Sequence, residues 1–90
     1  MLAHYRKVLL PHDYEERHFR CGGEPTAFTL GDWRIGLLIC CELEMLEPAR
    51  FPVRSGCDLV VAPTALTDDW SVVARQLVPA RAFENTAFFA

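Results

Sequence analysis

The stretch Trp33-Arg34-Ile35-Gly36-Leu37-Leu38-Ile39-Cys40-Cys41-Glu42 contains the longest uninterrupted apolar run of the chain. Three consecutive apolar residues, Leu37 to Ile39, are typical of a strand that is covered on both faces. Glu42 and Glu44 follow this run, and the helix dipole favours acidic side chains in the first turn of a helix. The stretch therefore predicts a buried strand over residues 33–39 that leads directly into a short helix over residues 42–50.

Upstream of this stretch, the sequence predicts two further strands and a loop. Tyr5 to Leu10 is interpreted as a strand that Pro11 ends. The polar segment from His12 to Pro25 is expected to be mostly loop, because it is charged and ends in glycine and proline. Ala27 to Leu30 is a short strand, and the dipeptide Gly31-Asp32 predicts a hairpin turn into the strand that follows.

Downstream, the sequence predicts another strand between two helices. Pro52 should end or kink the first helix, and Leu59 to Ala62 is a continuous apolar strand. Thr67-Asp68-Asp69 offers N-caps for a helix that begins near Trp70 and that Pro79 bends. A last strand begins in the segment from Thr86 to Ala90. Alternation of buried strands with helices predicts a layered α/β fold, with residues 1–90 forming part of one domain.

Composition excludes several classes of protein. The 90 residues carry a net charge of −3 and are 51% hydrophobic, which is typical of a soluble globular chain. The small negative charge argues against a nucleic-acid partner or an anionic membrane surface. No apolar run approaches the roughly 20 residues that a membrane helix needs. The four cysteines fit neither a secreted disulfide scaffold nor a zinc site, so we expect a reducing, cytoplasmic setting and no bound metal.

Cys40 is the candidate nucleophile, because it lies where the apolar strand meets the expected helix. A helix N-terminus stabilises a thiolate, and the backbone N–H of the next residue, Cys41, could face an oxyanion on an attacked substrate. The alternative is a buried structural cysteine, since free cysteine is among the most buried residue types. The position of Cys40 in the sequence alone favours the interpretation as a buried structural cysteine.

Lys7 is the second candidate, because it lies in the middle of an apolar segment. A buried lysine needs a partner, and a cation close to a thiol lowers the thiol pKa. The alternative is a lysine that points to solvent from an alternating strand. Glu15 and Glu16 belong to a charged segment that is either a solvated loop or the source of a carboxylate that reaches and orients Lys7.

These residues lie in four ordered motifs that together resemble the nitrilase, or carbon–nitrogen hydrolase, superfamily. The segment Tyr5-Arg6-Lys7-Val8-Leu9-Leu10-Pro11 resembles the lysine motif. The nucleophile motif is matched by Gly36-Leu37-Leu38-Ile39-Cys40-Cys41-Glu42-Leu43-Glu44-Met45-Leu46-Glu47. Gly56-Cys57-Asp58-Leu59-Val60-Val61-Ala62-Pro63-Thr64-Ala65 is similar to the strand after the nucleophile helix. Ala80-Arg81-Ala82-Phe83-Glu84-Asn85 is similar to the end of a later helix. The resemblance covers essentially the whole chain.

The resemblance implies a set of roles and a chemistry. Cys40 would be the nucleophile, Lys7 the lysine of the catalytic triad, and Glu15, four residues before Phe19, an accessory glutamate. The implied reaction is thiolate attack on a small amide or nitrile, with a thioester intermediate and without any metal or organic cofactor. The segment after Pro63 resembles the aliphatic-amidase branch. The implied fold of the complete protein is an αββα sandwich that forms a homo-oligomer.

The chain also departs from the family pattern. The family's general base is a glutamate well upstream of the lysine motif, whereas residues 1–6 contain neither Glu nor Asp. Leu9 replaces the usual His, Cys41 replaces an aromatic or polar residue, and Leu46 replaces a Pro. We therefore interpret the chain as the central part of an amidase-like carbon–nitrogen hydrolase, truncated at both ends and inactive alone. The alternative is a catalytically inactive interaction or scaffold piece.

Overall fold

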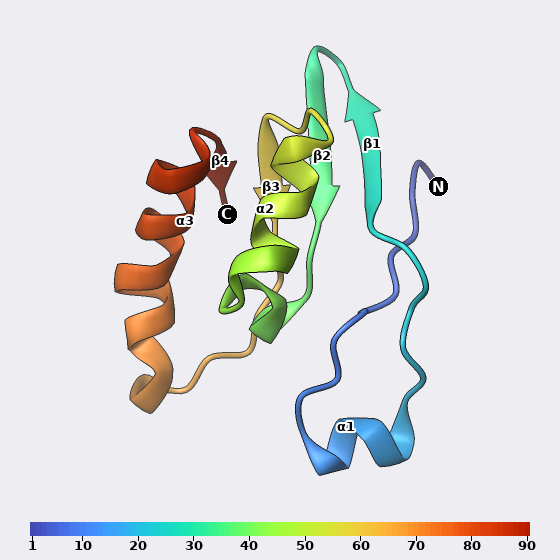
Figure 1. Cartoon of the computed structure of the whole chain (residues 1–90), viewed down its shortest axis with the longest axis vertical. Coiled ribbons are helices and arrows are strands. Elements are labelled where there is room, and N and C mark those ends of the chain that lie inside the picture. Colours follow the sequence, from blue (N-terminus) through green and yellow to red (C-terminus); the bar gives the residue numbers. More distant parts are fainter.

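The computed structural model describes residues 1–90, which form a four-stranded sheet with helices packed against it (Figure 1). The strands lie in the order of the sequence: β1 (Thr26–Leu30), β2 (Trp33–Leu37), β3 (Leu59–Val61) and β4 (Phe88–Phe89). β1 and β2 are antiparallel, while β3 and β4 run parallel to β2. The sheet is therefore mixed, with a hairpin on one side and parallel crossover connections on the other.

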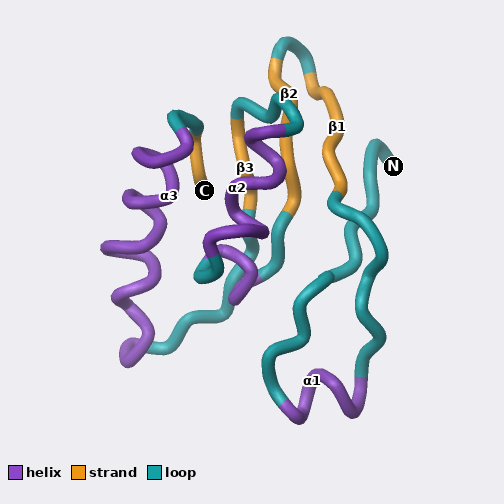
Figure 2. Tube along the Cα trace, in the orientation of Figure 1, coloured by secondary structure: helices purple, strands orange, loops and turns teal.

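The chain also contains three α-helices and three shorter helical turns, of which all but the first α-helix lie between strands (Figure 2). The α-helices are α1 (Asp13–His18), α2 (Leu46–Arg54) and α3 (Val78–Asn85). Two 3₁₀ turns span Cys40–Leu43 and Asp68–Trp70, and a π-helical turn spans Val73–Leu77. Figure 1 shows α1 far from the sheet, at the end of the N-terminal loop, whereas α2 and α3 run beside it.

The core lies between one face of the sheet and the two longer helices. A row of paired residues across the sheet, Gly36, Val60 and Phe89, faces this side. Val60 is completely buried, and it packs with Ala49 of α2 among other apolar residues. A Cβ added at Gly36 would lie 2.5 Å from the Cβ of Pro52, so α2 approaches the sheet closely because position 36 has no side chain.

The opposite face of the sheet is apolar and has no helix over it. Ile35, Leu59 and Phe88 form a paired row there, one residue out of phase with the core row. The ring of Trp33 packs edge-on against that of Phe88, with centroids 5.5 Å apart. Trp33 is still 46% exposed and Phe88 63% exposed, so this face leaves large aromatic surface in contact with solvent.

The structure confirms the hairpin and the strand that follows the first helix, but it differs from the sequence prediction at the N-terminus. No strand forms over Tyr5 to Leu10, which is loop throughout. The segment from His12 to Pro25, expected to be mostly loop, contains α1. This short helix has three acidic residues in its first turn and Arg17 and His18 in its last turn, an arrangement that complements the helix dipole.

The helix predicted from Glu42 is divided in two. A 3₁₀ turn begins already at Cys40, and α2 begins at Leu46 and continues past Pro52 to Arg54. Pro52 does not end α2, and it is buried against Gly36, where packing offsets the hydrogen bond that proline cannot donate. Pro79 lies in the first turn of α3, directly after the π-helical turn, so the expected bend appears as a change of helical winding.

Candidate active site

Cys40 lies at the carboxyl end of β2, where the chain turns sharply away from the sheet. Hydrogen bonds between β2 and the chain at β3 continue beyond the ends of the two strands. The Leu38 N–H donates to the Val61 carbonyl and the Cys40 N–H to the Pro63 carbonyl, both at 3.0 Å. Cys40 itself has a φ of 52°, in the left-handed region that side chains other than glycine rarely adopt. Strain of this kind is concentrated at functional sites, and it turns the Cys40 side chain away from the strand direction.

The loop that carries Lys7 is held against two other segments. The Gly22 N–H donates to the Lys7 carbonyl at 2.7 Å, and Arg6 donates from its guanidinium to the Cys21 carbonyl at 3.0 Å. A side chain at position 22 would overlap the Arg6 carbonyl oxygen, so the two stretches can approach only because residue 22 is glycine. The loop is thus fixed by a few specific contacts rather than by a strand ladder.

Lys7 and Glu15 form an ion pair with two hydrogen bonds. The Lys7 ammonium donates to both carboxylate oxygens of Glu15, at 2.7 and 2.8 Å, and the side chains are only 12% and 25% exposed. Burial by itself would lower the pKa of Lys7, but the hydrogen bonds to Glu15 and to the Cys41 thiol raise the pKa above its usual value. Lys7 therefore remains a cation at neutral pH. Glu16, the neighbouring acid, is exposed and makes no such contact.

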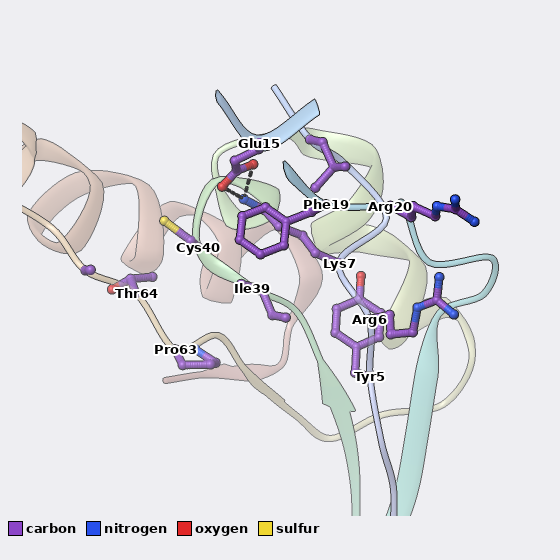
Figure 3. A pocket seen from close by; sticks show the side chains of 12 residues that line it. Tyr5, Arg6, Lys7, Glu15, Phe19, Arg20, Ile39, Cys40, Pro63 and Thr64 are labelled. Carbon is purple, nitrogen blue, oxygen red and sulfur yellow. Dashed lines mark hydrogen bonds and ion pairs between the residues drawn. The ribbon is translucent and has the colours of Figure 1, made fainter. Parts of the chain in front are cut away.

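Lys7, Glu15 and Cys40 all line one cavity of about 700 Å³ (Figure 3). Its remaining wall is largely apolar and includes Phe19 from beyond α1 and Thr64 from beyond β3. The same three residues also line an adjoining cavity of about 340 Å³ on the side of Trp70. The structure thus brings together, from three separate segments, the thiol, the cation and the carboxylate that the sequence singles out.

Cys41 follows Cys40 in the same 3₁₀ turn, with its side chain buried. Burial raises the pKa of the Cys41 thiol, and the Lys7 ammonium beside it only partly opposes this effect. Cys41 therefore remains a neutral thiol at pH 7. The part of its backbone N–H as an oxyanion donor stays a prediction.

The buried position of Glu42 was not predicted from the sequence. Its side chain is fully buried and accepts hydrogen bonds from the Tyr5 hydroxyl and from three backbone N–H groups. The sequence signal was present, since an acid directly after an apolar run is expected to need partners, but a helix-dipole interpretation already accounted for it. Burial and the Glu42 carboxylate raise the pKa of Tyr5 well above its usual value, so Tyr5 remains a hydrogen-bond donor.

No group of three or more His, Cys, Asp or Glu side chains is arranged to hold a metal ion. None of the helices has the length and apolar character needed to cross a membrane.

The chain belongs to the carbon–nitrogen hydrolase family, whose model matches residues 1–90. It is 36% identical over 90 residues to a Pseudomonas protegens protein named "Hydrolase in pqqF 5'region", covering 99% of this chain and 32% of that protein. It is 33% identical over 84 residues to an (R)-stereoselective amidase of a Pseudomonas species, covering 93% of this chain and 30% of that protein.

Solved structures of an amidase from Nesterenkonia sp. AN1, of the nitrilase superfamily, share this fold. One mutant of that enzyme superposes with a TM-score of 0.92 at 37% identity, covering 99% of this chain and 34% of that one. Further structures of that enzyme are a complex of a mutant with butyramide and a mutant after Michael addition of acrylamide at the active-site cysteine. The chain thus spans about a third of the length of these relatives.

Proposed function

We propose that the protein containing these residues hydrolyses small amides through a thioester on Cys40. The observation that carries the proposal is that the Lys7–Glu15 ion pair and the strained Cys40 line one cavity. The butyramide and acrylamide complexes of the Nesterenkonia amidase support short amides as the substrate class. A cavity with mostly apolar walls suits the alkyl part of such a substrate.

In the proposed reaction, the Cys40 sulfur forms a bond to the amide carbon and the carbonyl oxygen becomes an oxyanion. The Lys7 ammonium and the Cys41 backbone N–H stabilise that charge, and Glu15 holds the ammonium in place. The oxyanion collapses and breaks the carbon–nitrogen bond, and ammonia leaves with the proton that the general base took from the thiol. Water then attacks the thioester, gives its proton to the same base, and releases the acid and the thiol.

The proposal assigns the general base to a carboxylate outside residues 1–90. Glu15 is the only acidic side chain that lines the larger cavity, and both its oxygens already accept hydrogen bonds from Lys7. Glu42 is buried with its carboxylate occupied by four donor groups, so it is unsuited to take a proton from Cys40.

The proposal extends to the architecture of the complete protein. The uncovered apolar face of the sheet, with Trp33 and Phe88 exposed, is suited to pack against a second sheet in an αββα sandwich. Assembly of the complete protein into a homo-oligomer is part of the same proposal. The lack of a free carboxylate in the larger cavity favours a second candidate function, a non-catalytic interaction or scaffold piece.

Turnover of butyramide by the intact protein tests the proposal. We expect ammonia release, and we expect Cys40→Ser to lower the rate by about 10²-fold or more. Cys21→Ser is the matched control, because Cys21 is an exposed cysteine outside both cavities. Acid quenching during turnover should leave an acyl group on the peptide that contains Cys40. A folded protein with neither turnover nor an acylated peptide would favour the scaffold function.

A further inference from the structure

The carboxylate of Glu42 connects the two segments that carry the candidate nucleophile and the candidate cation. One oxygen accepts the Val8 N–H at 2.7 Å and the Leu9 N–H at 3.1 Å. The other oxygen accepts the Ile39 N–H at 2.8 Å, and the Tyr5 hydroxyl lies 2.8 and 2.9 Å from the two oxygens. These donors flank Lys7 on both sides and directly precede Cys40.

The same carboxylate has no cationic partner. The ion pairs of the structure join other residues, and Glu42 has zero exposure to solvent. A buried carboxylate is costly unless hydrogen bonds satisfy its lone pairs. Here four N–H and O–H groups do so, and three of them come from the N-terminal loop, whose backbone donors have no strand ladder to join. The charge and the loop therefore stabilise each other.

We infer that Glu42 is a positioning residue that fixes the Lys7 loop against the Cys40 turn and thereby holds the Lys7 ammonium at the cavity that Cys40 lines. The inference rests on the proposed function, in which the Lys7 ammonium stabilises the oxyanion, and it adds that a cation in this place favours a thiolate. Glu42 lines neither of the two cavities at Cys40, so it does not touch substrate and acts only through the two segments.

Glu42→Gln removes the charge at nearly constant shape and leaves an amide NH₂ facing donor groups. The amide oxygen can accept from one set of N–H groups, but the NH₂ then opposes either the Ile39 N–H or those of Val8 and Leu9. The loop is expected to shift away from the turn and to take Lys7 with it. Glu42→Asp keeps the charge but is one methylene shorter, so it should restore part of the effect.

The readout is the pH dependence of iodoacetamide alkylation of Cys40, followed by peptide mapping in the intact protein. A displaced Lys7 should raise the pH midpoint, because a nearby cation favours the thiolate. If Glu42→Gln removed the negative charge without moving Lys7, the pH midpoint would fall instead. The sign of the shift therefore separates positioning from simple charge removal.

Lys7→Gln removes the cation, and Glu24→Gln, at an exposed residue without a side-chain hydrogen bond or ion pair, controls for net charge. The other titratable or charged groups of the two cavities are Tyr5, Arg6, His12, Glu15, Arg20, Cys41 and Glu44. Tyr5 and Arg6 belong to the Lys7 loop and move with it, and a displaced Arg6 changes the midpoint in the same direction as a displaced Lys7. We expect Lys7→Gln and Glu42→Gln to raise the midpoint, with Glu42→Asp between Glu42→Gln and wild type.

The outcomes separate this inference from the proposed function. If Lys7→Gln leaves the midpoint unchanged, Lys7 does not act on the Cys40 thiol and the inference is overturned, whereas the proposed function is judged by turnover of butyramide. If Lys7→Gln raises the midpoint but Glu42→Gln lowers it or only reduces thermal stability, Glu42 is a structural residue and the inference is overturned. If Glu42→Gln does not fold, Glu42→Asp decides: a raised midpoint supports positioning, and a wild-type midpoint refutes it.

Discussion

Replacing Glu15 by Gln removes the charge from the partner of Lys7 while keeping the size of the side chain and one oxygen. Hydrogen bonds to charged groups contribute about 1.5–3 kcal/mol, and those between neutral groups about 0.5–1.5 kcal/mol. The pair is mostly buried, with the side chains 12% and 25% exposed, so screening by solvent is limited. We expect Glu15→Gln to lower the free energy of unfolding by about 1–2 kcal/mol.

The same change should lower the pKa of Lys7. Burial opposes the charged ammonium, and in the wild type the hydrogen bonds to Glu15 and the Cys41 thiol outweigh that effect. A loss of about 1.4 kcal/mol corresponds to about one pKa unit. Because the folded-state pKa of Lys7 lies above the usual 10.5, its stabilisation is complete below that pH. It is lost as the pH rises through the folded-state pKa.

Lys7 is the only lysine among these 90 residues, so amine chemistry can follow it without ambiguity within this segment. Acetylation with acetic anhydride at a series of pH values, with peptide mapping, gives its midpoint, and urea denaturation gives the stability. Glu16→Gln is the matched control, because it removes the same charge from an exposed residue in the same first turn of α1. Equal midpoints and stabilities for Glu15→Gln and Glu16→Gln would refute the reasoning.

Three further outcomes are expected. In the intact native protein, iodoacetamide should label Cys40 before Cys57, because burial raises the pKa of the Cys57 thiol; faster labelling of Cys57 would contradict the assignment. Gly36→Ala should lower the unfolding free energy in urea by about 1–3 kcal/mol, because its Cβ meets Pro52, whereas Gly23→Ala, with no atom within 4 Å, should have little effect. Residues 1–90 expressed alone should associate through the exposed apolar sheet face and should not turn over butyramide, which ultracentrifugation and ammonia release can check; a soluble, active monomer would refute this expectation.

The parts of the fold that local sequence determines were predictable. The hairpin between β1 and β2 follows from a turn dipeptide between apolar segments, and the apolar run over Leu59 to Val61 forms β3. The Lys7 segment was predicted wrongly as a strand. The Glu42 carboxylate satisfies its backbone donors from more than 30 residues away, and no local pattern encodes such a contact.

The candidate site was predictable to a similar degree. Cys40 and Lys7 are conspicuous in the sequence, and a contact between Lys7 and Glu15 was one of the interpretations that it allowed. The sequence did not indicate that Cys40 would have a left-handed backbone, because cysteine has no preference for that region. An acid directly after an apolar run indicated that Glu42 needs partners, but nothing in the sequence indicated that the Tyr5 hydroxyl and the backbone N–H groups of Val8 and Leu9 would supply them.

The backbone conformation of Cys40 has a consequence for how this position can vary. Left-handed φ values cost a side chain other than glycine roughly 1–2 kcal/mol, and glycine almost nothing. At most positions glycine is less stable than alanine, but here the order should reverse, with a glycine variant more stable than an alanine variant. A chain optimised for stability alone would therefore have glycine at position 40. Cys40 adopts a backbone conformation in which any side chain lowers the stability of the fold, so stability and reactivity compete at this residue.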